Sequence, residues 1–180
     1  YALLSLLLSK APTLEVLSDV GRLNGGDKEI GDAIDTLGVL AKKIDIQTIG
    51  REYHNLFIGV GRGELLPYGS FYMTGFLNEK PLANLRDDMK RIGIIRANST
   101  SDPEDHIASL CEMMSGIISN QFYTKLSLKQ QSDFFGTHLG PWAKHFFGDL
   151  EGAENSVFYA PVGKLGRAFM EVEMEAFKFL

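Results

Sequence analysis

Two segments of the sequence gather aromatic, acidic and imidazole side chains at short spacing. Aromatic rings offer apolar contact area, while carboxylates pair with guanidinium groups through two parallel hydrogen bonds. The segments therefore indicate a binding site for a partner that is apolar in one part and cationic in another. Their candidate site residues are Glu52, Phe57, Pro67, Tyr68, Gly69, Ser70, Phe71 and Tyr72 in the first segment, and Pro103, Glu104, Asp105 and His106 in the second.

Composition limits the functions that such a site can serve. The chain has 180 residues, of which 44% are hydrophobic and 23% charged, so residues 1–180 are expected to fold as a single domain. The formal net charge of -5 argues against a nucleic-acid binder and favours a cationic partner. Since Cys111 is the single cysteine, no intramolecular disulfide can form, and we expect a cytoplasmic protein.

Apolar residues recur at helical spacing along the whole chain, and strand-like alternation is absent from the pattern. We therefore predict an all-α, bundle-like fold of about nine or ten helices. The opening run Tyr1 to Leu8 is expected to be a core helix, because it is too short to cross a bilayer and has no positive segment before it. The aromatic cluster around Trp142 and Phe146 is also expected to lie in the core.

Two irregular stretches interrupt the predicted helices. The connection from Gly59 to Ser70 is long for a compact domain, and long loops are often functional. The polar stretch at 96–103 is a hinge candidate between an N-terminal half (1–95) and a C-terminal half (104–180). A hinge of this kind lets identical chains exchange segments, so both a monomer and a segment-swapped dimer are open.

The acidic segment has an ordinary local interpretation as the start of a helix. Asp102 would be the N-cap, Pro103 the first helical residue, and Asp105 the acid that reaches back as in a capping box. This interpretation does not require His106, which would lie at the edge of the buried stripe and could line a pocket. That stripe comprises Ile107, Leu110, Cys111, Met114, Ile117 and Ile118.

Enzymatic alternatives find less support in the residues. The sequence has no Glu-x-x-His and no His-x-x-x-His, so neither a metal site nor any other cofactor is expected. The glycine run from Gly59 lacks the strand and the Gly-Lys-Ser/Thr of a phosphate loop. A small helical hydrolase or nucleotide-binding enzyme that uses Asp105 and His106 stays open as an alternative, as does a structural assembly subunit of a redox complex.

The order of these motifs resembles the TorD/DmsD family of cytoplasmic chaperones. Relatives carry a Glu, then Leu-Phe and Gly, then a proline-aromatic-Gly-Ser-aliphatic-aromatic run, and later an acid-Pro-acid-Asp-His motif. Tyr68 stands where many relatives have tryptophan. The matching residues here are Glu52, Leu56, Phe57, Gly59, Pro67 to Tyr72, and Asp102 to His106, with Phe134-Phe135, His138-Leu139, Pro141-Trp142 and Phe158-Tyr159 following downstream.

The resemblance implies a non-catalytic chaperone with a TorD-like fold. Its partner would be the twin-arginine signal peptide, together with the folded body, of a molybdopterin oxidoreductase. Binding would assist cofactor insertion and delay export. Tyr68, Phe71 and Tyr72 would form an apolar wall, and Asp105, Glu104 and Glu52 would offer carboxylates to the arginines. The client enzyme stays open.

Overall fold

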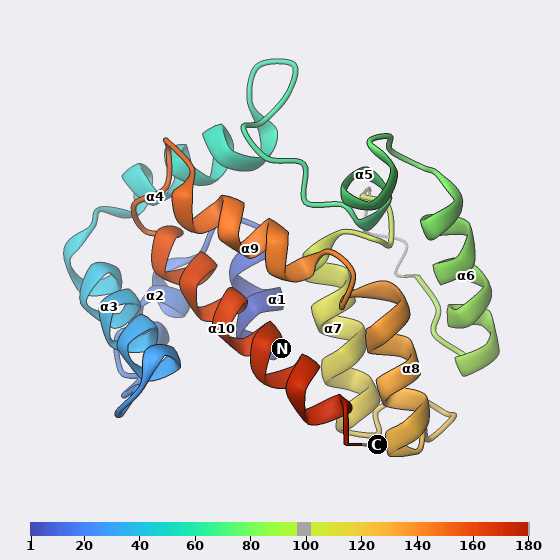
Figure 1. Ribbon diagram of the computed structural model, residues 1–180. Helices are drawn as coiled ribbons and strands as arrows, with labels where there is room; N and C mark the ends of the chain where they lie inside the picture. The colour runs from blue at the N-terminus through green and yellow to red at the C-terminus, as the bar shows by residue number, and fades with distance from the viewer. Residues whose placement is uncertain (97–101, 180) are drawn as a thin grey trace.

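The computed structural model describes residues 1–96 and 102–179, and in them the chain is all-α, as predicted. These residues form ten α-helices and one π-helix, and Figure 1 shows how they are arranged. The α-helices are α1 (Ala2–Ser9), α2 (Leu14–Val20), α3 (Glu29–Lys43), α4 (Ile46–Tyr53), α5 (Gly69–Thr74), α6 (Lys80–Ile92), α7 (Ile107–Ile118), α8 (Leu128–His138), α9 (Ala143–Gly152) and α10 (Ala160–Phe177), and the π-helix η1 is His54–Ile58.

Helices α9 and α10 run side by side through the middle of the molecule, with α1 behind them and α6 at one edge (Figure 1). Two glycines on α10 permit this close approach. A Cβ added at Gly166 would lie 2.2 Å from the ring of Phe147, and one at Gly163 would lie 2.4 Å from the backbone nitrogen of Glu151. Any larger side chain at these positions would push the two helices apart.

The core contains most of the residues that the periodicity predicted. Trp142, Phe146 and Phe147 are fully buried, and α1 contributes three buried leucines to the same core. Cys111 has no exposed surface, and burial raises the pKa of its thiol to about 12, which marks it as a structural rather than a reactive cysteine. None of the described helices combines the length and apolarity needed to cross a membrane.

Two local predictions are wrong. Helix α7 begins at Ile107 with His106 as its N-cap, so Asp102 is not the cap, Pro103 is not the first helical residue, and Asp105 does not belong to a capping box. The stretch Gly59 to Ser70 is not a loop throughout, because α5 already begins at Gly69. Residues 97–101 of the hinge candidate at 96–103 lie outside the described residues.

Glu52 connects the end of α4 to the start of α10. Its side chain is 7% exposed, and its carboxylate accepts hydrogen bonds from the backbone N–H groups of Val157, Phe158 and Tyr159 at 2.8, 3.1 and 2.8 Å. The chain turns into α10 at these residues, so one carboxylate pairs three amides that no helix would otherwise satisfy.

We predict that Glu52→Gln lowers the free energy of unfolding by about 2–4 kcal/mol, because an amide NH₂ would then face backbone donors in a buried site. Thermal and denaturant unfolding measure the change. Glu154→Gln is the matched control, since Glu154 is exposed and should shift stability by less than about 0.5 kcal/mol. Equal stability of Glu52→Gln and the wild type would contradict this role.

Candidate functional site

The two segments singled out in the sequence lie against each other. Tyr68 and His106 form an isolated antiparallel β-bridge, in which Ile107 N–H donates to the carbonyl of Pro67 at 2.8 Å and Gly69 N–H to the carbonyl of Asp105 at 3.0 Å. The rings of Tyr68 and His106 meet edge to face with centroids 5.2 Å apart. The aromatic and acidic segments therefore lie in direct contact.

Asp105 lies beneath this surface rather than on it. It is 2% exposed, and its Oδ2 accepts the backbone N–H of Ser70 at 2.7 Å. Ser70 is in the first turn of α5, so Asp105 caps a helix that is distant in sequence. Among the described residues, the second oxygen, Oδ1, has no hydrogen-bond partner.

His106 is buried and neutral. Its Nδ1 accepts the backbone N–H of Ala108 at 3.1 Å, which makes the imidazole the side-chain cap of α7. Burial lowers the pKa of His106 to about 4, although the nearby charges of Asp102 and Asp105 act in the opposite direction. A neutral imidazole has the lone pair that this cap requires.

The other predicted carboxylates already have partners within the protein. Glu104 is nearly buried and accepts two hydrogen bonds from Arg86, at 3.0 Å from Nε and 2.8 Å from Nη2. Burial acts to raise the pKa of Glu104, but the bonds from Arg86 outweigh it and hold the pKa below its usual value. The Glu52 carboxylate accepts its hydrogen bonds from the backbone at the start of α10, and not at the contact between Tyr68 and His106.

Several remaining site residues support the surface. Phe57 packs against Tyr53 and Tyr159, with ring centroids 5.0 and 5.5 Å apart. A Cβ at Gly69 would come within 3.0 Å of Trp142 Nε1, so only glycine lets α5 approach the core this closely. Pro103 is half-buried. These positions hold the aromatic segment in place.

Two exposed aspartates flank the aromatic segment, and their roles were not predicted from the sequence. The Tyr68 hydroxyl donates to Asp102 Oδ1 at 3.3 Å, and the Tyr72 hydroxyl donates to Asp149 Oδ2 at 2.8 Å. Burial is the largest cause that raises the pKa of both tyrosines, and the neighbouring carboxylate adds to it. Each hydroxyl therefore keeps its proton and donates it to the hydrogen bond. Phe71, which lies between the two tyrosines in the sequence, is half-buried. The Arg62 guanidinium carbon lies 6.0 Å from the centroid of the Phe71 ring.

No signal in the sequence could have linked Tyr72 to Asp149, which lies 77 positions away. Asp102 was considered only as a helix cap, and its contact with Tyr68 depends on the β-bridge. The exposed carboxylates of the site thus come from residues that only the fold brings to the aromatic segment.

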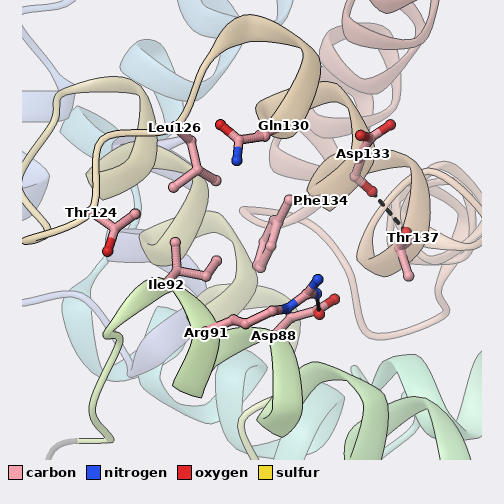
Figure 2. A pocket seen from close by; sticks show the side chains of 9 residues that line it. All are labelled: Asp88, Arg91, Ile92, Thr124, Leu126, Gln130, Asp133, Phe134 and Thr137. Atoms are coloured by element: carbon pink, nitrogen blue, oxygen red, sulfur yellow. Dashed lines mark hydrogen bonds and ion pairs between the residues drawn. The ribbon is translucent and has the colours of Figure 1, made fainter.

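A separate pocket of about 260 Å³ lies between α6 and α8 (Figure 2). Its charged groups pair within the protein: Asp88 forms an ion pair with Arg91, and its Oδ2 lies 2.7 Å from Nε2 of buried His138. Burial, and then the charge of Arg91, lower the pKa of His138 to about 4. The described residues contain no cluster of three His, Cys, Asp or Glu side chains suited to a metal.

The two buried histidines predict how stability depends on pH. Both have a folded pKa of about 4 against an ordinary value of 6.5, so the unfolded chain takes up protons first as the pH falls. Their contribution to stability is therefore complete above about pH 7 and is lost as the pH falls from 6.5 to 4.

His106→Asn keeps a side chain that can cap α7 and removes one titrating group, so its stability should fall less steeply across this pH range. Urea unfolding at a series of pH values measures the slope. His145→Asn, at an exposed position, should reproduce the wild-type curve. If His106→Asn also reproduced it, the buried imidazole would not be the cause.

Comparisons with known proteins show which family this chain resembles. A family model described as nitrate reductase delta subunit matches residues 24–148, more than half of the chain. The chaperone protein TorD of Vibrio cholerae is 28% identical over 166 residues, which cover 88% of this chain and 74% of that protein. The protein named "Probable Tat proofreading chaperone DmsD" in Haemophilus influenzae is 29% identical over 121 residues, covering 66% of this chain and 57% of that protein.

A crystal structure from Archaeoglobus fulgidus, described as a candidate redox enzyme maturation protein, has the same fold. Its TM-score is 0.63 at 23% identity, and the match covers 94% of this chain and 91% of that one. The named relatives are chaperones rather than enzymes, which removes the hydrolase and nucleotide-binding alternatives. The chain therefore belongs to the nitrate reductase delta subunit family, as a chaperone of the TorD/DmsD type for redox enzyme maturation.

Proposed function

We propose that this chaperone acts in the cytoplasm, where it binds the twin-arginine leader and the apo form of a molybdopterin oxidoreductase. Binding assists cofactor insertion and delays export until the cofactor is in place. The observation that carries the proposal is the contact between Tyr68 and His106, which brings the aromatic segment and the acidic segment together.

The chemistry of this surface matches a leader peptide. Such a peptide has a cationic start followed by an apolar run of about 7 to 15 residues. Tyr68, Phe71 and Tyr72 supply half-buried rings, and Asp102 and Asp149 supply exposed carboxylates beside two of those rings. Arginine suits both groups, because its planar guanidinium bonds carboxylates through two N–H groups and stacks on aromatic faces.

The expected affinity is moderate. Ordering a flexible peptide costs about 2 to 5 kcal/mol of the gross interaction energy. The exposed aspartates lie in contact with solvent, where ion pairs contribute little and salt weakens them. A moderate affinity is consistent with a chaperone that must release its client before export.

The names of the relatives support the same proposal. DmsD of Haemophilus influenzae is named a Tat proofreading chaperone, and TorD of Vibrio cholerae a chaperone protein. The name of the matching family model refers to a subunit of nitrate reductase, which keeps the structural assembly subunit as the second candidate function. A permanent subunit would co-purify with the mature enzyme in fixed stoichiometry, whereas a maturation chaperone would co-purify with the cofactor-free form.

We predict that Asp102→Lys weakens binding of a synthetic twin-arginine leader peptide about 10-fold at low salt, because it replaces an attractive charge by a repulsive one. Tyr68→Ala should weaken binding by a similar factor through lost ring contacts. Isothermal titration calorimetry measures both affinities. Glu15→Lys is the matched control, since this exposed residue lies on α2, outside the site, and makes the same change in net charge.

The same peptide with two lysines in place of the arginines should bind more weakly to the wild type, because an ammonium cannot form the two parallel bonds of a guanidinium. Binding of the wild type that does not depend on Asp102, Tyr68 or the arginines would reject this surface as the leader site.

A further inference from the structure

Helix α6 is held to the rest of the protein by few side chains. Its outer face is mostly polar and exposed, and the helix lies at one edge of the molecule (Figure 1). Of its 13 residues, four are buried: Leu82, Leu85, Met89 and Ile92. A segment with few buried apolar contacts can open locally while the rest of the protein stays folded.

Two pockets of about 260 Å³ each interrupt the packing beneath α6. The first is the pocket between α6 and α8, and Ile92 and Phe134 reach into it from these two helices (Figure 2). The second is lined in part by Leu85 of α6 and Leu110 of α7. Well-packed interiors have few voids larger than a water molecule, and a side chain beside a void loses contacts on that side. The two pockets therefore weaken the apolar contacts that hold α6.

Polar contacts add to the forces that keep α6 in place. Asp88 lines the first pocket and His138 the second, so the 2.7 Å contact between Asp88 Oδ2 and His138 Nε2 lies between the two pockets. Two residues earlier in α6, Arg86 donates its two hydrogen bonds to Glu104. The side chains of Asp88 and Arg86 are 21% and 46% exposed, so water can replace their bonds when the helix moves away.

The chain can change direction at both ends of α6. Gly75 and Asn78 precede the helix and Gly93 follows it, with φ values of 83°, 61° and 78° in the left-handed region. Residues 75–79 are all exposed, and Glu79, the N-cap of α6, makes no side-chain capping bond. Hinges are a few such residues at the ends of an element, which absorb a change in backbone angles while the element moves.

We infer that α6 is a lid that opens between Gly75 and Gly93 while the other helices stay folded. Opening breaks the polar contact between the two pockets, joins them into one groove and uncovers Leu110 and Phe134, which are buried in the closed form. The lid thus gives the protein an apolar surface that it presents only in a minor open state. This motion is a property of the chain itself and does not depend on the proposed leader site.

Native-state amide hydrogen exchange on the full chain tests the lid. A detached helix of 13 residues is marginal in water, so its amides exchange each time the lid opens. The α6 amides should be protected about 100-fold less than those in the middle of α7, and their exchange should depend little on low concentrations of urea. Equal protection and equal urea dependence in α6 and α7 would mean that α6 opens only when the whole protein unfolds, which would overturn the inference.

Two neighbouring aspartates of α6 test the contact that closes the lid. Asp88→Ala removes the partner of buried His138, which exists only in the closed form, so protection of the α6 amides should fall about 10-fold. Asp87→Ala is the matched control, because exposed Asp87 forms an ion pair only with Lys90 of the same helix and should change protection less than about 2-fold. Equal effects of the two substitutions would contradict a lid held by the contact to α8.

A substitution far from α6 separates lid opening from global unfolding. Ile49 is fully buried on α4, on the other side of the molecule from α6 (Figure 1). Because α4 stays packed whether the lid is open or closed, Ile49→Val should lower protection in α7 about 5-fold and leave protection in α6 unchanged. If protection in α6 and α7 fell by the same factor, the two helices would open together and the lid would be rejected.

Discussion

The buried carboxylate of Asp105 is the interaction on which the candidate site depends. Helix α5 has only six residues, and helices this short are unstable in water without tertiary support. Asp105 supplies that support twice, through its side chain to the N–H of Ser70 and through its backbone carbonyl to the N–H of Gly69. Without these bonds the Tyr68 to Tyr72 surface would have no fixed orientation, and the β-bridge to His106 would lose its anchor.

Much of the fold could be predicted because its determinants are local. Ser127 and Gln130 form the complete capping box that starts α8, and Pro81 occupies the first turn of α6. The apolar stripe of α7 is buried along its length, apart from Ile118 at its end. Apolar periodicity and capping residues act within one or two helical turns, so they can be recognised in the sequence alone.

The start of α7 could not be predicted, because two demands compete for the same carboxylate. Asp102, Pro103 and Asp105 satisfy the local rules for a helix N-terminus, yet the carboxylate of Asp105 instead accepts the N–H of Ser70 in α5, 35 positions earlier. His106 then takes the place of the cap with its imidazole. Burial and the N–H groups at the start of α5 decide which helix Asp105 caps, and both are properties of the folded chain. The Tyr72 to Asp149 contact escaped prediction for the same reason.

Asp105 also shows that one residue can position a helix and still cost the protein stability. An apolar or amide side chain in place of Asp105 would remove an unpaired buried charge, and an amide would still cap α5. The carboxylate therefore costs the free protein stability that the cap alone does not require. The position of Asp105 is thus set by the N–H groups at the start of α5, although one of its carboxylate oxygens has no hydrogen-bond partner among the described residues.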